Sequence, residues 1–393
     1  MQRFAFIFVL LLLVPDAYIY WLYIKSLVTS YKLQATSYKL LWWLPSILLI
    51  MAFLAARYIG TNNAMSERQG IIAWLGVAIL CIGVPKMIFM LVTLLGRAIH
   101  LIIKPIQNKH FTILAILMAL GFFLVSIYGC LFGIAQLQVK KVDYYSAHLP
   151  EGFNGYRIVQ ISDIHSGSFK QRPDILRKMV QVVNDQQANL IVFTGDLVNQ
   201  KSDEADQFIE ILSQLHAPDG VYSILGNHDY GLYYRWSQPE KEKQNMQHLE
   251  QLHAKMGWKL LKDQHDIIQH KGDSIVIIGV ENDGNPPFPR LSDLPGASKG
   301  TEGMFRILLS HDPTHWRREV LPTTDIDLTL SGHTHGAQFM LLGWSPASWI
   351  YDEWGGMYHE GSQSLYVNIG IGYVGLPFRF GAWPEVTVFT LHE

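Results

Sequence analysis

The chain has 393 residues, 49% of them hydrophobic, and a formal net charge of −2 at pH 7. That length allows two or three domains, and a near-neutral charge argues against a bulk electrostatic nucleic-acid binder, so we expect no nucleic-acid partner. The only cysteines, Cys81 and Cys130, lie in apolar runs of the first third, which excludes a disulfide framework and a thiolate metal site from the rest.

Four apolar stretches in the first third are long enough to cross a bilayer, which takes about 20 helical residues. They are Phe4 to Leu27, Leu40 to Ile59, Ile71 to Ala98 and Thr112 to Gln136. We therefore expect residues 1–139 to form an all-α transmembrane region with four helices, and the chain to be a multi-pass protein of the cell membrane in contact with membrane lipids. A signal peptide is the alternative for the first stretch, but Asp16 and the lack of a small-residue cleavage site favour a retained helix.

Two ionisable residues, Asp16 and Lys86, fall inside predicted spans. Charge is costly in lipid, so a functional role is one hypothesis for each. Pro15 and Pro85 lie beside them, so kinks that face the interior of the helix bundle are an equally good explanation.

Loop charges bear on which side of the membrane the carboxyl-terminal part lies. Four spans place it on the same side as Met1. Six basic residues lie on the opposite side, namely Lys25, Lys32, Lys39, Arg97, Lys104 and Lys109, and five on its own side, namely Arg3, Arg57, Arg68, Lys140 and Lys141. The positive-inside rule then favours an extracytoplasmic catalytic domain by a single charge, so both sides stay open.

Charged residues, Gly and Pro return near Lys140, and residues 140–393 are expected to form a second domain. Short apolar runs predict strands at Tyr156 to Ser162, Leu190 to Thr194, Val221 to Leu225, Ser274 to Val280, Phe305 to Ser310, Leu328 to Ser331, Leu365 to Asn368 and Glu385 to Leu391. Helices are expected at Pro173 to Asp185, Asp203 to Gln214 and Lys243 to Met256, and a surface loop at Asp283 to Lys299. Strands and helices that alternate at first, followed by a strand-rich half, predict an α/β domain.

Five polar clusters follow apolar runs in this second part, which is where α/β sheets place reactive groups. They are Asp163-Ile164-His165, Gly195-Asp196, Gly226-Asn227-His228-Asp229, Ser310-His311-Asp312 and Gly332-His333-Thr334-His335. Alternation along an extended chain predicts that Asp163 and His165 point to one side. Each cluster alone is typical of a turn or a strand end. Together they offer nitrogen and oxygen donors without sulfur, which suits two divalent transition-metal ions such as Mn, Fe, Zn or Co.

This constellation resembles the calcineurin-like metallophosphoesterase superfamily, and within it the membrane-attached bacterial subgroup similar to YkuE. The resemblance runs from about Tyr156 to Leu391. It implies an α/β fold, a four-layer α/β/β/α sandwich with a dinuclear site, placed after the transmembrane region. It also implies the ligands: Asp163, His165 and His335 for one metal ion, Asn227, His311 and His333 for the second, and Asp196 as the bridge between them.

The same resemblance implies the reaction. A phosphate ester or pyrophosphate bond is hydrolysed by attack of a metal-bridging hydroxide, and His228, which is not a ligand, faces the substrate as the general acid. Many relatives carry a second Asp three residues beyond the bridging one, which orients this histidine. Here that position is Asn199, and the adjacent Asp229 is the candidate replacement.

Aromatic residues gather after the last cluster, in the segment Trp344 to Tyr358. Trp and Tyr favour membrane interfaces, so Trp349 and Trp354 are expected to bind the apolar part of a lipid phosphate or lipid-linked pyrophosphate. The segment is expected to be a loop beside the metal centre that faces the bilayer. The alternative is that its aromatic side chains pack the domain against its own helices.

Two other function classes fit less well. A non-catalytic membrane receptor or scaffold that retained the fold should have lost at least one donor, whereas the donor set is complete. A transporter should carry more charges inside its spans. The sequence therefore predicts an integral-membrane, metal-dependent phosphoesterase.

Overall fold

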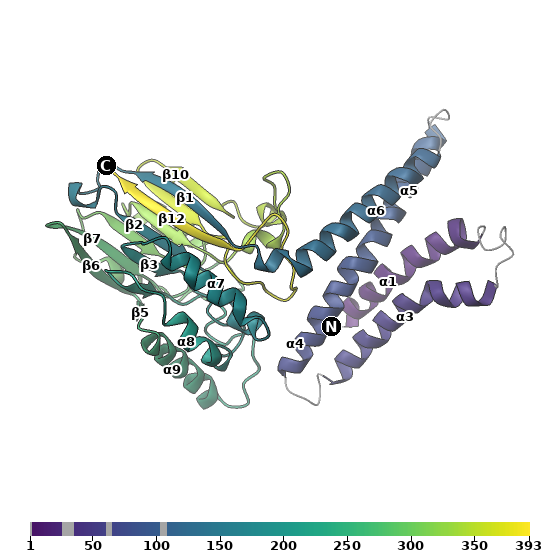
Figure 1. Cartoon of the computed structure of the whole chain (residues 1–393), viewed down its shortest axis with the longest axis horizontal. Helices are drawn as coiled ribbons and strands as arrows, with labels where there is room; N and C mark the ends of the chain where they lie inside the picture. The colour runs from purple at the N-terminus through teal and green to yellow at the C-terminus, as the bar shows by residue number, and fades with distance from the viewer. Residues whose placement is uncertain (1, 26–34, 60–64, 103–107) are drawn as a thin grey trace. The chain divides into compact units, whose positions relative to one another are not determined.

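The computed structural model describes residues 2–25, 35–59, 65–102 and 108–393. The chain divides into two compact units, residues 1–131 with 375–378 and residues 132–374 with 379–393. Figure 1 shows the first as a set of long helices in purple and blue, and the second as strands and shorter helices in teal to yellow. Each unit is described on its own below.

The first unit consists of apolar helices at the predicted positions. These are α1 (Gln2–Ile19) with the π-turn η1 (Tyr20–Ile24), α3 (Ala35–Ile59), α4 (Met65–Ala78), the π-turn η2 (Ile79–Gly83), α5 (Val84–Ile102) and α6 (Asn108–Leu131). The expected end of the first span at Leu27, and Lys32 and Lys104 of the charge count, lie outside the described residues. The last span was expected to reach Gln136, but α6 ends at Leu131 and a 3-10 turn follows.

Two stretches, Ile71–Ile102 and Asn108–Ala135, are helical, apolar and long enough to cross a membrane, and all but the last four residues of the second belong to this unit. Within α1 with η1 and within α3, the apolar stretches found are shorter than 18 residues, Val9–Ile24 and Leu40–Ala55. A four-pass arrangement therefore stays a prediction, as does the side of the membrane on which the second unit lies.

The two ionisable residues of the predicted spans meet inside the helical unit. Lys86 Nζ lies 2.6 Å from Asp16 Oδ1, and the Asp16 side chain is fully buried. Lys86 also donates to Ser46 Oγ at 3.4 Å and lies over the ring of Trp42, whose Nε1 donates to the Asp16 carbonyl. A proline has no N–H to continue a helix, and the π-turn η2 immediately precedes Val84 and Pro85. The kinked, inward-facing arrangement thus has a structural explanation.

The second unit is built on two six-stranded sheets. The first has the order β1 (Gln138–Tyr145), β12 (Glu385–His392), β2 (Arg157–Ile161), β3 (Leu190–Phe193), β4 (Val221–Ser223) and β5 (Lys259–Leu260). The second has the order β10 (Gly356–Glu360), β11 (Gln363–Val367), β9 (Leu328–Ser331), β8 (Arg306–Leu309), β7 (Asp273–Gly279) and β6 (Gln264–His270). β2 to β5 run parallel, as do β7, β8, β9 and β11.

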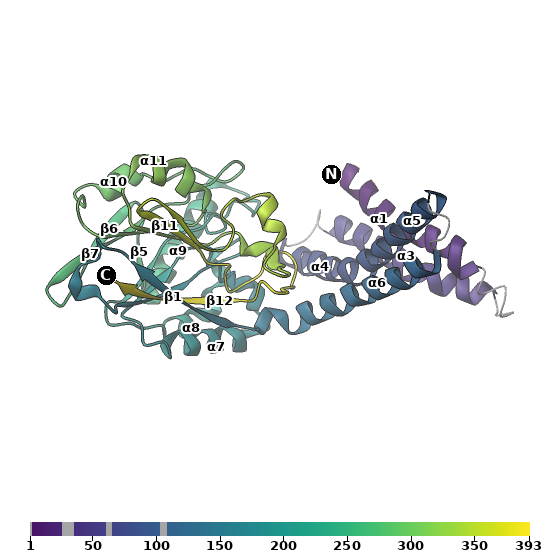
Figure 2. The same cartoon turned by 90° about the horizontal axis from the view of Figure 1, so that it is seen from above.

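Helices cover the outer faces of the two sheets, as Figure 2 shows. On the first sheet lie α7 (Pro173–Asn184), α8 (Ile209–Leu212) and α9 (Pro239–Lys255), and on the second lie α10 (Leu294–Ser298), the π-turn η8 (Trp316–Val320) and α11 (Leu321–Thr323). Buried apolar side chains fill the space between the sheets, among them Ile158, Val192, Ile277 and Leu309. The predicted four-layer α/β/β/α sandwich is therefore confirmed.

The elements differ from expectation in three ways. The helix predicted at Asp203 to Gln214 is broken into 3-10 turns before the single turn of α8. The loop predicted at Asp283 to Lys299 contains α10, which Asp293 caps by accepting from Gly296 N. Four strands, β1, β5, β6 and β10, were not predicted. All four are edge strands; β1, β6 and β10 carry exposed polar residues, and β5 has two residues only.

The topology brings the five polar clusters to one end of the sandwich. β2, β3 and β4 lead into Asp163, Asp196 and Asn227, while β8 and β9 lead into His311 and His333. The two sheets thus contribute three and two of the clusters, at the carboxyl ends of parallel strands.

Candidate metal centre

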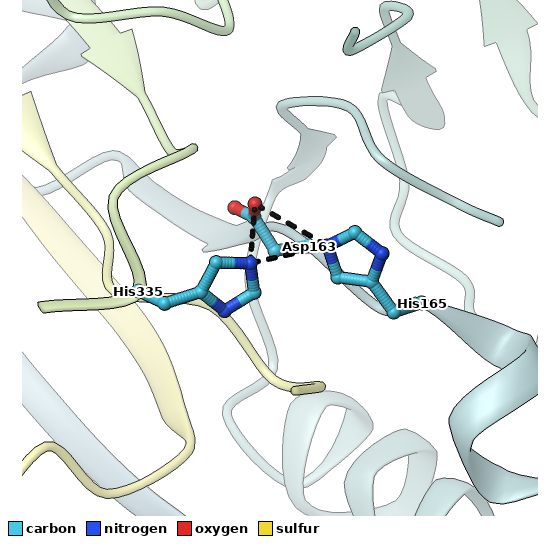
Figure 3. A group of neighbouring side chains, drawn as sticks. All are labelled: Asp163, His165 and His335. Atoms are coloured by element: carbon cyan, nitrogen blue, oxygen red, sulfur yellow. Dashed lines mark hydrogen bonds and ion pairs between the residues drawn. The ribbon is translucent and has the colours of Figure 1, made fainter. Parts of the chain in front are cut away.

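The first group of donors comprises Asp163, His165 and His335, all buried (Figure 3). His335 Nε2 lies 3.2 Å from Asp163 Oδ1 and 3.1 Å from His165 Nε2. His165 Nε2 is 3.9 Å from the same Asp163 oxygen. Three donors from loops 170 residues apart in the chain thus point at one spot.

The second group comprises Asn227, His311 and His333. His333 Nδ1 lies 2.8 Å from Asn227 Oδ1 and 3.3 Å from His311 Nε2. Asp196 lies between the groups, since its Oδ2 is 3.2 Å from His311 Nε2 and 3.5 Å from His165 Nε2. One carboxylate therefore faces donors of both groups.

Hydrogen bonds outside the two groups fix which atom each ligand presents. His311 Nδ1 donates to the Thr194 carbonyl at 2.7 Å, which turns Nε2 towards Asp196. Asn227 Nδ2 donates to the Tyr233 hydroxyl at 2.8 Å, which turns the amide oxygen towards His333. These orientations, and a donor set of nitrogen and oxygen without sulfur, fit divalent transition-metal ions.

The backbone at the site is unusual, because five of the predicted ligands have positive φ. The values are 52° for Asp163, 47° for His165, 61° for Asp196, 75° for His333 and 52° for His335. Such conformations are costly for residues with a Cβ and concentrate at functional sites. Asp163 and His165 were expected to point to one side because side chains alternate along an extended strand. That reason is wrong, because β2 ends at Ile161. Left-handed turns, rather than an extended strand, aim the two side chains.

Burial and neighbouring charges act together on these groups. Burial alone would raise the pKa of Asp196, but His311 and His228 hold that pKa well below its usual range. Burial alone would lower the pKa of His311, but Asp196 raises it to about 10. Burial lowers the pKa of His165 and of His333, so both imidazoles are neutral at pH 7. Carboxylates that stay ionised while fully buried, Asp163 and Asp196, make a site that favours a cation.

His228 lies beside the first group, with its ring 4.8 Å from that of His165. Its Nδ1 donates to the backbone carbonyl of Asn199 at 2.6 Å, and its ring stacks on Tyr233 at 4.2 Å. Its backbone N–H donates to Asp196 Oδ1 at 2.8 Å. Asn199, which stands where many relatives have an orienting Asp, therefore still orients His228 through its main-chain carbonyl.

Asp229 does not orient His228. Its carboxylate accepts four backbone N–H bonds, from Gly226 and from the three consecutive residues Asp196, Leu197 and Val198, at 2.9 to 3.2 Å. It therefore ties the Asp196 loop to the Asn227 loop. Asp229 is a positioning residue for two predicted ligands, and the hypothesis that it replaces the missing acid is wrong.

Two further side chains hold metal-centre histidines and were not predicted to do so. The Tyr351 hydroxyl lies 2.9 Å from His333 Nε2. Arg379, which is fully buried, donates from Nη2 to His335 Nδ1 at 2.9 Å. A guanidinium can only donate, so His335 Nδ1 accepts from Arg379, and Nε2 is the ring nitrogen that faces Asp163 and His165. Arg379 follows its partner by 44 residues and has no sequence signal.

The aromatic segment Trp344 to Tyr358 begins beside the site, because Tyr351 contacts His333 and the Thr334 hydroxyl donates to the Trp354 carbonyl at 2.6 Å. It is not wholly a loop, since its last residues form the start of β10. Trp349 is 77% exposed and packs on Trp344, with 5.2 Å between ring centroids. Its binding role stays a prediction.

Comparison with known proteins agrees with this architecture. Residues 156–337 match the calcineurin-like phosphoesterase family, and residues 2–134 match a probable calcineurin-like phosphoesterase transmembrane domain. The chain is 35% identical over 258 residues to the metallophosphoesterase YkuE of Bacillus subtilis (strain 168), covering 63% of this chain and 82% of that protein. It is 30% identical over 284 residues to a transmembrane protein with a metallophosphoesterase domain from Danio rerio, covering 68% and 60% respectively.

The fold and the site define a metal-dependent phosphoesterase. The chain belongs to the calcineurin-like metallophosphoesterase family and carries a transmembrane domain, as the sequence predicted.

Proposed function

We propose that this membrane phosphoesterase is dinuclear, with Asp163, His165 and His335 holding one divalent ion and Asn227, His311 and His333 the second. Asp196 would bridge the two. The observation that carries this proposal is the position of Asp196 Oδ2, within 3.5 Å of a donor nitrogen from each group.

When bound, two such ions supply a water of lowered pKa as nucleophile and charge that stabilises the phosphoryl oxygens. His228 would give a proton from Nε2 to the leaving oxygen, because Nδ1 is committed to the Asn199 carbonyl. Tyr233 holds the flat face of the His228 ring and, through its hydroxyl, the Asn227 amide. One tyrosine thus positions both the proposed acid and a proposed ligand.

The proposed substrate is a phosphate ester or pyrophosphate carried on a lipid. Two observations support this class: the transmembrane domain, which the apolar helices form, and the exposed Trp349, near Tyr351, which contacts His333. The non-catalytic scaffold becomes the weaker reading, because the chain belongs to an enzyme family and its seven donors converge.

Metal analysis of the full-length chain in detergent tests the dinuclear proposal. After reconstitution with Mn²⁺, we expect two ions per chain and hydrolysis of bis-p-nitrophenyl phosphate. Asp196→Asn and His333→Ala should each abolish hydrolysis while the protein still inserts and folds. Asp185→Asn makes the same charge change at an exposed residue and should behave as wild type. One ion or none in the wild-type chain, or near-normal turnover in either ligand variant, would contradict the proposal.

A further inference from the structure

A pocket of about 400 Å³ is lined by residues that follow the loops around His228 and is not used by the proposed mechanism. Three segments line it: residues 201–203, residues 234–237, and one side of α9 from Lys241 to His248. The first two segments continue directly from the loops that hold His228. Asn199, whose carbonyl accepts from His228, is two residues before Lys201, and Tyr233, which stacks on His228, precedes Tyr234.

Positive charge dominates this pocket. Lys201, Arg235 and Lys241 line it, against one carboxylate, Asp203, which lies 2.7 Å from Lys201 Nζ. Among the described residues no acidic partner is found for Arg235 or Lys241. The remaining titratable residue, His248, is held by Asp206 at 3.0 Å. Two cations are therefore left without a counter-charge.

A buried hydrogen-bond donor in the same pocket lacks an acceptor. Asn245 is only 8% exposed, and its Oδ1 accepts from Ser202 N at 2.8 Å and from Ser202 Oγ at 2.9 Å. Those two bonds fix the amide orientation, yet Asn245 Nδ2 has no partner within the described part of the chain. A buried amide donor without an acceptor is costly, so this one is suited to an acceptor that enters the pocket.

Two other features favour an anion there. Ser237, two residues before α9, and Lys241, in its first turn, border the pocket, and the positive end of a 17-residue helix attracts negative charge. Tyr234 and Trp236, 4.5 Å apart, flank the opening, and Lys201 Nζ lies 5.3 Å above the Tyr234 ring. The pocket thus combines cations, an unpaired donor and a helix N-terminus.

We propose that this pocket binds a phosphate group. Unpaired donors and surplus cations select an anionic acceptor, and a phosphate can accept from a guanidinium, an ammonium and an amide at once. On the proposed function, on which this step rests, the bound group is a second phosphate of the substrate. A phosphoesterase that acts on a doubly phosphorylated lipid would hold one phosphate at the metals and the other in the pocket.

Binding of inorganic phosphate to the chelator-treated full chain, followed by calorimetry, tests the pocket without needing metal or turnover. Asn245→Asp keeps the oxygen that accepts from Ser202 but replaces the free donor with negative charge. We expect it, and the pair Arg235→Ala and Lys241→Ala, to weaken phosphate binding at least about tenfold. Lys243→Ala removes a charge from the same helix outside the pocket and should bind as wild type. Undetectable binding to the wild-type chain, or unchanged binding by Asn245→Asp, would overturn the proposal.

Kinetics of the Mn²⁺-loaded chain identify the source of the phosphate. With mixed micelles, Asn245→Asp should raise KM for lipid A, whose two phosphates stand on different sugars, at least about tenfold and leave KM for monophosphoryl lipid A unchanged. If Asn245→Asp changed the KM of both lipids by the same factor, or of neither, while it weakened the binding of inorganic phosphate, the pocket would be a site for free phosphate. Its role as a substrate subsite would then be overturned. Neither result depends on whether the metal centre holds one ion or two.

Discussion

At the scale of single residues, the contact between His228 Nδ1 and the Asn199 carbonyl settles what orients the proposed acid. A side-chain carboxylate at position 199 is unnecessary, because a main-chain carbonyl 2.6 Å away fixes the same ring nitrogen as a donor. Nε2 is then the ring nitrogen left for the proposed transfer of a proton to the leaving group.

His228→Ala should lower turnover of an alkyl phosphate ester by about 10²–10⁴-fold and turnover of a p-nitrophenyl ester much less. The reason is that p-nitrophenolate needs little protonation as it leaves. Steady-state kinetics on the two substrates, with metal content measured on the same preparation, provide the check.

The control for that experiment is the metal content, which should stay as in the wild-type chain. His228 lies with His165 and Asp196 in a group of donors within 4.8 Å of one another, so a ligand role is a concrete alternative. Loss of an ion in His228→Ala would recast His228 as a ligand, and an equal loss of rate for both leaving groups would exclude the acid role.

The sequence predicted which residues gather at the site but not how they are held there. Five clusters after strands could be recognised because donor type and chain order are local signals. The partners Tyr351 and Arg379 could not, because they reach His333 and His335 through tertiary contacts alone. The left-handed backbone of Asp163 and His165 was also missed, since non-glycine residues give no sign of positive φ in a sequence.

At the scale of elements, the aromatic segment Trp344 to Tyr358 has two tryptophans in different surroundings. Trp349 is 77% exposed, whereas Trp354 is partly buried next to the Thr334 hydroxyl. A surface role in lipid binding is therefore testable at Trp349 with little risk to the fold.

Trp349→Ser should impair cleavage of a lipid phosphate in vesicles and spare bis-p-nitrophenyl phosphate, because only the lipid has an apolar part to bind. Ile350→Ser, at an adjacent residue that is also 77% exposed, tests whether the effect belongs to the tryptophan. If Trp349→Ser affected both substrates equally, the segment would serve the fold rather than the substrate.

The bounds of strands buried on both faces were predicted well. The helix whose course depends on tertiary contacts was not. β9 has the predicted bounds, and β2, β3 and β8 lie within theirs, because continuous apolar runs are an unambiguous signal. The helix expected at Asp203 to Gln214 breaks because Glu204 turns back to accept from the backbone N–H groups of Asn199 and Gln200. That contact serves the loop whose carbonyl orients His228.

At the scale of the whole molecule, the helical unit contains its own buried ion pair, Asp16 with Lys86. Removing one partner of a buried pair leaves an uncompensated charge, whereas replacing both with apolar side chains of similar size can be neutral or stabilising. The pair therefore offers a sharp test of whether these residues hold helices together or serve catalysis.

Asp16→Ala should lower the thermal stability of the detergent-solubilised chain, by a free energy of about 3–5 kcal/mol if the pair is fully desolvated. The double replacement Asp16→Leu with Lys86→Met should restore most of that stability. Thermal unfolding and metal-dependent turnover, measured on each variant, separate the roles. Full stability with lost turnover in the double variant would reveal a functional pair.

The two-sheet origin of the ligands has a consequence for how the chain can be divided. The first group joins Asp163 and His165 of one sheet to His335 of the other, and the second joins Asn227 to His311 and His333 in the same way. A cut near Asp263, where the chain passes from β5 to β6, would leave each fragment with an incomplete donor set for either ion. Only reassembly of the fragments, helped by β12 returning to the first sheet, would rebuild the centre, so bound metal would act as a cross-link between the halves.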